Sequence, residues 1–209
     1  MTVRRPSAGI ALLLVVFLGG CGGGGGPQPT PTPVPTPTPS FCIAAPSAYG
    51  QAVTEWWLPN CDVNRNLYNN PSEALGAPNA GGVGPNNYRG FVSLGMGGFV
   101  IVDLGGCIED MPGNDLRVHQ AVSREPVSVY VAAAPSGPYT LLGARVPCGE
   151  RAGACEFDLA AGGVPRARYV KVQDGELFPC PNDSKSAGAD LDSVQAIWVA
   201  ASEADGGRQ

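Results

Sequence analysis

Two aspartates near the C-terminal end of the sequence, Asp190 and Asp192, are spaced so that they could hold a cation together. Alternate residues of a β-strand point to the same side, so both carboxylates would face one way if this segment is a strand. Calcium takes six to eight oxygen ligands, and Asp174, Asn182 and Asp183 could add oxygens to such a shell. Aspartates also commonly cap turns through nearby backbone amides. The spacing therefore allows a calcium site without requiring one.

Large aromatic side chains form a second group of candidate binding residues, because flat rings can stack against the apolar faces of sugars. Trp56 and Trp57 are adjacent, so in a strand one of the two indoles faces outward. The segment 79–90 combines Tyr88 and Arg89 with asparagines, a composition typical of a binding rim and equally of a solvated loop. We predict that Trp56, Trp57, Tyr88 and Arg89 contact a ligand.

Catalytic motifs are missing from the sequence. His119 is the only histidine, and no G-x-S-x-G motif marks a nucleophile for it to activate. The glycines at 95–98 precede a strand-like run, so they lack the helix end that binds phosphate in glycine-rich loops. The net charge of −5, with no basic run beyond the N-terminal segment, disfavours nucleic-acid binding. We expect a protein that is not an enzyme and does not bind nucleic acid.

The first 20 residues have the pattern of an export signal. Arg4 and Arg5 precede an apolar run at 10–18, which is shorter than the ~20 residues that cross a bilayer. The following Leu18-Gly19-Gly20-Cys21 resembles the lipobox of bacterial lipoproteins. The resemblance implies that Cys21 is lipidated and anchors the mature chain to a membrane of the cell envelope. Because Gly22 rather than aspartate follows, we expect the outer membrane if the source is Gram-negative.

The composition changes sharply after Cys21. Residues 21–40 consist of the lipidated cysteine, a glycine run and alternating prolines and threonines, which predicts a disordered, semi-rigid linker. Residues 41–204 are enough for one well-buried domain, and residues 205–209 are expected to form a disordered tail. The linker would hold the domain away from the membrane surface.

Six further cysteines favour three disulfides, since an exported chain enters an oxidising compartment. Cys148 and Cys155 bracket residues 149–154 between two strand-like runs, which favours a local bond. A zinc site is disfavoured, because no C-x-x-C pair occurs and the histidine is distant in sequence. The other four cysteines allow several pairings, from which we choose Cys42 with Cys61 and Cys107 with Cys180.

Short alternating apolar runs separated by turn residues predict an all-β antiparallel sandwich. In these runs Val127, Val129 and Val131 share one face, which we expect to point into the core. Leu116 and Val118 should do the same. A short helical turn is expected at 70–76, with Asn70 as its cap. The predicted strands are 98–104, 115–120, 127–133, 155–159, 168–173 and 194–200.

Five motifs follow one another in an order that resembles the galactose-binding-like jelly rolls related to discoidin, in particular a bacterial cell-surface subgroup. The resemblance implies an antiparallel jelly-roll β-sandwich, a fold that often binds carbohydrate and frequently holds a structural calcium ion. It also adds Asp115 to Asp190 and Asp192 as predicted calcium ligands. The motifs lie at 72–78, 92–98, 113–118, 168–172 and 188–194.

Anchor, fold and lack of catalytic motifs together lead to one functional expectation. The chain is predicted to be a membrane-anchored, surface-displayed binding module for carbohydrate or glycoconjugate. A structural or protein-interaction domain of the envelope is the first alternative, and a carbohydrate-active enzyme is the second. Fold alone does not decide among them.

Overall fold

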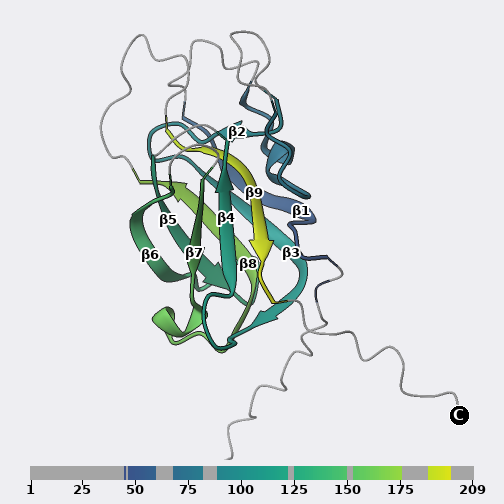
Figure 1. Cartoon of the computed structure of the whole chain (residues 1–209), viewed down its shortest axis with the longest axis vertical. Coiled ribbons are helices and arrows are strands. Elements are labelled where there is room, and N and C mark those ends of the chain that lie inside the picture. The colour runs from purple at the N-terminus through teal and green to yellow at the C-terminus, as the bar shows by residue number, and fades with distance from the viewer. Residues whose placement is uncertain are drawn as a thin grey trace, which may run out of the picture. The chain divides into compact units, whose positions relative to one another are not determined.

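Two antiparallel β-sheets face each other in the computed structural model of the protein (Figure 1). The structure describes residues 45, 47–59, 68–81, 89–121, 125–149, 153–175 and 188–198, all within the compact unit Ser40–Gln209. One sheet has the strand order β1-β3-β8-β5-β6, and the other has the order β2-β9-β4-β7. The strands are β1 (Ala52–Trp57), β2 (Val92–Ser93), β3 (Phe99–Glu109), β4 (Leu116–Gln120), β5 (Pro126–Ala132), β6 (Thr140–Pro147), β7 (Ala154–Phe157), β8 (Arg166–Asp174) and β9 (Asp190–Ala196).

Consecutive strands mostly alternate between the two sheets, as in a jelly roll. Every strand pair is antiparallel, from β1 with β3 to β4 with β9. The all-β antiparallel sandwich predicted from the alternating runs is therefore confirmed. The described strands leave β1 and β6 as the edges of the five-stranded sheet.

The core lies between the sheets and is built from the side chains that alternation assigned to it. Val127, Val129 and Val131 of β5 are at most 1% exposed, as predicted. Leu116 and Val118 of β4 are also fully buried. The alternation of apolar and polar residues predicted these buried positions correctly, because each of these strands buries only one face. The same main cluster includes Val100, Val102, Leu104, Val170, Val172, Leu191 and Val194.

Three strands were missed by the sequence analysis: β1, β2 and β6. β1 reads AVTEWW and is exposed along most of its length, so it lacks an apolar alternation. β6 contains Gly143 and Arg145, and Arg145 has a φ of 52° at a break in the pairing with β5. β2 is only two residues long. All three are short or irregular strands, for which periodicity is a weak signal.

The predicted helical turn is present as the 3-10 helix η1 (Pro71–Ala74). Its cap is Asn70, as expected, and the Asn70 side chain accepts a hydrogen bond from the Ser72 amide at 3.2 Å. A second 3-10 helix, η2 (Leu159–Gly162), follows β7 and is capped by Asp158. Within the described part of the chain, no helix is long and apolar enough to cross a membrane.

Gly98 lies where two segments come too close for any side chain. A Cβ on Gly98 would clash with the carbonyl oxygen of Leu94 and would lie 2.8 Å from the carbonyl oxygen of Trp57. Cδ of Pro59 would be 2.6 Å away. Glycine is the residue that allows backbone to approach backbone this closely. Gly98 therefore sets the distance between the end of β1 and the start of β3.

One predicted disulfide is confirmed: Cys148 and Cys155 are bonded, with their Cα atoms 4.6 Å apart. Both cysteines are buried, and the bond connects the end of β6 with β7. Cys107 in β3 is also disulfide-bonded. Cys42, Cys61 and Cys180 lie outside the described residues, so their pairing stays a prediction. The predictions for residues 1–20, Cys21, the linker and the tail fall there as well.

Candidate ligand-binding face

A row of side chains crosses all five strands on the outward face of the larger sheet. Glu55 pairs with Ile101, Ile101 with Lys171, Lys171 with Tyr130, and Tyr130 with Leu141. Directly paired residues lie on the same side of a sheet, so these five side chains share one face. At the usual spacing between strands, the row spans about 19 Å. It is long enough for an extended ligand.

The neighbouring row on the same face starts at a tryptophan. Trp57 pairs with Phe99, and Phe99 pairs with Gln173, which in turn pairs with Ser128. The Trp57 side chain lies on the edge strand β1 and is 54% exposed. Because β1 is an edge strand among those the structure describes, the Trp57 indole presents a broad flat surface to solvent.

A small apolar cluster, separate from the main core, supports this face from within the sheet. Its buried members are Ile101, Ala132 and Tyr169. Phe99 and Tyr139 pack against these three residues while remaining partly exposed. We call Trp57, Phe99, Tyr130 and Tyr139 the aromatic face. The Phe99 and Tyr139 rings rest on this packed layer, so little side-chain entropy is lost when a ligand contacts these two rings.

Lys171 stands in the middle of the aromatic face. Its Nζ atom lies 4.0 Å from the centroid of the Phe99 ring and 5.7 Å from the centroid of the Tyr130 ring. Rings at these distances attract an ammonium group through their negative faces. The strand register explains the arrangement, because Lys171 lies on β8 between β3 and β5. The face therefore combines apolar rings with a positioned positive charge.

Tyr139 contributes a hydroxyl group from the loop between β5 and β6, and the oxygen of this hydroxyl can accept a hydrogen bond from a ligand. Its hydroxyl donates to the carbonyl oxygen of Pro135 at 2.9 Å. Burial raises the pKa of Tyr139, and the nearby Glu55 and Tyr169 raise it further. The hydroxyl therefore stays protonated over the whole neutral pH range. Tyr139 can act as a polar contact but not as a base.

An ion pair on β3 and β8 borders the aromatic face. Nε of Arg168 donates to Oδ1 of Asp103 at 2.8 Å, and its Nη2 donates to Oδ2 at 2.9 Å. The Arg168 guanidinium also lies 5.3 Å from the Tyr169 ring centroid. Burial by itself favours protonated Asp103, but hydrogen bonds from Arg168 and the Gly105 amide, with the charge of Arg168, outweigh it and lower the pKa. Asp103 is thus held ionised.

We expect Asp103→Asn to reduce the free energy of unfolding by about 1 kcal/mol at pH 7, because the pair is partly solvent-exposed. The folded-state pKa of Asp103 lies below its ordinary value of 3.8, so its contribution is complete above that pH. It is lost as the pH falls through the lowered folded pKa. Urea unfolding between pH 7 and pH 2.5 should show the two proteins converging only below about pH 4.

The exposed ion pair between Arg117 and Glu156 on the other sheet offers a matched control. Glu156→Gln should leave the urea midpoint at pH 7 nearly unchanged, since exposed pairs contribute little. A difference between wild type and Asp103→Asn that stays constant down to pH 2.5 would contradict the role given to the ionised carboxylate.

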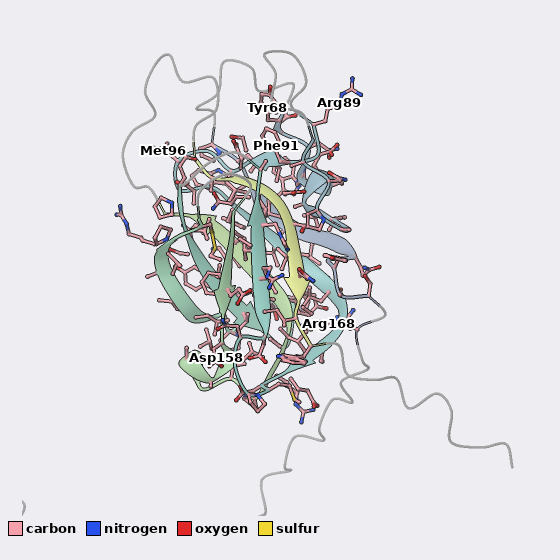
Figure 2. All side chains as sticks on the ribbon, in the orientation of Figure 1. Tyr68, Arg89, Phe91, Met96, Asp158 and Arg168 are labelled. Atoms are coloured by element: carbon pink, nitrogen blue, oxygen red, sulfur yellow. A yellow bond between two sulfur atoms is a disulfide. The ribbon has the colours of Figure 1, made fainter. Side chains whose placement is uncertain are left out.

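The structure separates the four residues that the sequence proposed as ligand contacts. Trp57 belongs to the aromatic face. Trp56 is 51% exposed but pairs with Val100, a core residue, so it points toward the other side of the edge strand. Alternation predicted that only one of the two indoles would be exposed. Both are exposed, because β1 is an edge strand. Arg89 lies with Tyr68 and Phe91 at the upper end of the sandwich (Figure 2). Tyr88 is outside the described residues.

The three aspartates that were grouped as calcium ligands lie at two different places. In the pairing of β4 with β9, Leu116 is opposite Ala196, whereas Gln120 is opposite Leu191. Asp115 therefore lies beside the last residues of β9, while Asp190 and Asp192 belong to its beginning. The structure does not bring these three carboxylates into one shell.

Backbone amides occupy the carboxylates of Asp115 and Asp192. Oδ1 of Asp192 accepts hydrogen bonds from the amides of Asn79 at 3.0 Å and Ala80 at 3.3 Å. Burial raises the pKa of Asp192, although these two bonds oppose the rise. Asp115 approaches Asp110 and Asp158, with ligand oxygens within 4.8 Å of one another. Both of its oxygens nevertheless accept amide hydrogens, as turn-capping aspartates do.

Neither the family models nor the curated proteins include a match to this sequence. Among solved structures, the chain is similar to the CBM32 of AlyQ in complex with 4,5-unsaturated mannuronic acid, at 12% identity and a TM-score of 0.42, over 71% of this chain and 97% of that one. It is also similar to chitosan-binding module 1 of a chitosanase/glucanase from Paenibacillus sp. IK-5, at 14% identity and a TM-score of 0.44, over 72% and 97%. CpGH89CBM32-6 from Clostridium perfringens follows at 13% identity and a TM-score of 0.38, over 70% and 91%.

Proposed function

We propose that this protein is a non-catalytic carbohydrate-binding module that holds a glycan chain across its aromatic face. The observation that carries the proposal is the set of partly exposed rings on one sheet surface, with the 54% exposed Trp57 at its edge. Rings can cover the apolar faces of pyranoses, while neighbouring polar groups bind the hydroxyls. Gln173 and Glu55 lie in the two rows beside the rings and offer such groups. A flat face about 19 Å wide suits several linked sugars.

The charges on this face argue against catalysis. Hydrolysis of a glycosidic bond needs a protonated carboxyl group opposite a second carboxylate. Among the described residues of the face, the carboxylates are Glu55 and Asp103, and Asp103 is held ionised by Arg168. Asp103 therefore cannot serve as the acid. These residues support binding without turnover.

Surface display is the second part of the proposal, and it is inferred from the sequence alone. The lipobox-like segment that ends at Cys21 and the Pro/Thr linker behind it support a tethered module at the cell envelope. In a Gram-negative source we place it at the outer membrane. A tethered module would concentrate glycan at the membrane surface.

Trp57→Ala should weaken glycan binding about tenfold, because it removes the broadest exposed ring of the face. Trp198→Ala is the matched control: Trp198 is 50% exposed, follows β9 on the other sheet and should leave binding unchanged. Both substitutions are made in the full chain carrying Cys21→Ser, which removes the expected lipid site. A glycan array followed by titration of the bound glycans measures the effect. Equal glycan affinity of Trp57→Ala and wild type would show that the aromatic face is not the binding site.

A protein-interaction module is the competing proposal, since aromatic side chains are also enriched at protein interfaces. A photo-crosslinking amino acid at position 57 distinguishes the two in cells. Capture of one envelope protein, with no glycan bound on the array, would favour the protein partner. Capture of polysaccharide would favour the carbohydrate-binding module.

A further inference from the structure

The charge at the centre of the aromatic face is not neutralised by a neighbouring acid. Lys171 contacts the rings of Phe99 and Tyr130 through cation–π interactions and forms no ion pair within the described structure. The carboxylate on the adjacent β3 strand, Asp103, is engaged by both donor groups of Arg168. Its charge is thus compensated and does not neutralise Lys171.

The other acid of the face is too far away to neutralise Lys171. Glu55 lies on β1, and β3 separates it from β8. Two strand spacings put its backbone about 10 Å from that of Lys171, close to the distance over which salt screens exposed charges. The Glu55 side chain is exposed on the edge strand, and its charge raises the pKa of Tyr139. Among the residues that the structure describes, Lys171 is therefore a positive charge among rings without an acidic partner in contact.

From this arrangement we propose that the preferred ligand is a polyuronate, a glycan whose pyranose rings carry carboxylates. The inference rests on the proposed function and names its substrate class. A uronate carboxylate is attached directly to the ring, so a sugar stacked on the exposed Trp57, which pairs with Phe99, can direct it toward the Lys171 ammonium that lies over the Phe99 ring. A sulfate ester extends further from its ring, which fits a charge held this close to the aromatic surface less well.

Polygalacturonate and polymannuronate, each compared with its own methyl ester, are the probes. The ester keeps the shape of the sugar chain and removes its charge. We expect the acid form to bind at least fivefold more tightly than the ester at low salt. Raising the salt from 0.05 M to 0.5 M should abolish most of this preference, since screening weakens exposed charge contacts.

Substitutions of Lys171 and Glu55 test the contribution of each charge separately. Lys171→Gln should weaken binding of the acid form about fivefold and thereby remove most of its preference over the ester. Lys171→Arg, which keeps the charge, should retain the preference to within about twofold. Glu55→Gln removes a repelling charge at the rim and should tighten the acid form about twofold. If Lys171→Gln does not fold, Lys171→Arg and the salt dependence of wild type still test the preference for the acid form.

The outcomes distinguish this inference from the proposal on which it depends. Binding of neutral and acidic chains with equal affinity, still weakened by Trp57→Ala, would overturn the polyuronate preference and leave the carbohydrate-binding module intact. Tighter binding of sulfated than of uronate chains would also overturn it. Failure to bind any chain at all would overturn both.

Discussion

Replacing Asp115 by asparagine will lower the free energy of unfolding by about 3 kcal/mol, the largest loss we expect from a single substitution. Oδ1 of Asp115 accepts the Met111 amide at 2.9 Å, and Oδ2 accepts the Leu159 amide at 2.9 Å. Asparagine keeps one oxygen but puts an NH2 group where the other was. Two donors then face each other at a fully buried position. A buried amide without an acceptor carries its full desolvation cost.

Asp158 provides the matched control for Asp115. Its Oδ1 atom accepts only the Ala160 amide, at 2.8 Å, at the start of η2. Asparagine is as good a cap as aspartate, so Asp158→Asn should change stability by less than about 0.5 kcal/mol. Urea titrations of both variants should show a shifted midpoint for Asp115→Asn with an unchanged slope. Nearly equal midpoints for the two variants would contradict the account of Asp115.

The second large effect is expected at Gly98, where alanine should cost about 2 to 3 kcal/mol. The added methyl group would overlap the carbonyl oxygen of Leu94 and press on the carbonyl oxygen of Trp57. These oxygens are backbone atoms, so rotation of a side chain cannot relieve the contact. Both the backbone at Leu94 and the end of β1 must move away from the start of β3. Because Trp57 moves with the end of β1, we expect glycan affinity to fall as well.

Gly149→Ala is the control for Gly98→Ala. Gly149 is exposed, and a Cβ there would meet no atom within 4 Å. Alanine also restricts the unfolded chain, so a neutral or slightly stabilising change is expected. Thermal unfolding and glycan titration are measured on both variants. A Gly98→Ala protein as stable as wild type would show that β1 is not held at the distance described.

The sequence was a good guide where strands bury one face. The valines of β5 alternate with polar or exposed neighbours, and the structure buries all three. Residues on β1 gave no such pattern, because an edge strand with Trp56 and Trp57 both displayed has no inner and outer side to alternate. Alternation thus succeeded or failed according to the environment of each strand.

The ligand-binding face was harder to predict than the fold. Alternation along the predicted strand 168–173 puts Lys171 on the face opposite to Val170 and Val172, away from the core. It could not say that β8 lies between β3 and β5, which is what brings Lys171 to Phe99 and Tyr130. Strand order depends on long-range pairing, and a single sequence carries little signal for it. Of the residues chosen in advance that the structure describes, Trp57 alone belongs to the aromatic face.

The grouping of Asp115 with Asp190 and Asp192 also depended on strand pairing, for which a single sequence carries little signal. Asp190 and Asp192 are close to each other whatever the pairing of β9. The position of Asp115 relative to them depends on how β4 pairs with β9. The motif order suggested the fold correctly without placing the motifs relative to one another. A carboxylate that caps a turn and one that binds a metal have the same sequence signature.

The bond between Cys148 and Cys155 has a consequence for proteolysis. β6 belongs to one sheet and β7 to the other, so this bond joins the two sheets covalently along one side of the sandwich. A protease that cuts the chain anywhere between these cysteines leaves both fragments attached, and only reduction separates them. In a molecule cut there, the aromatic face, on β1, β3, β5 and β8, would therefore stay covalently connected to the strands of the other sheet.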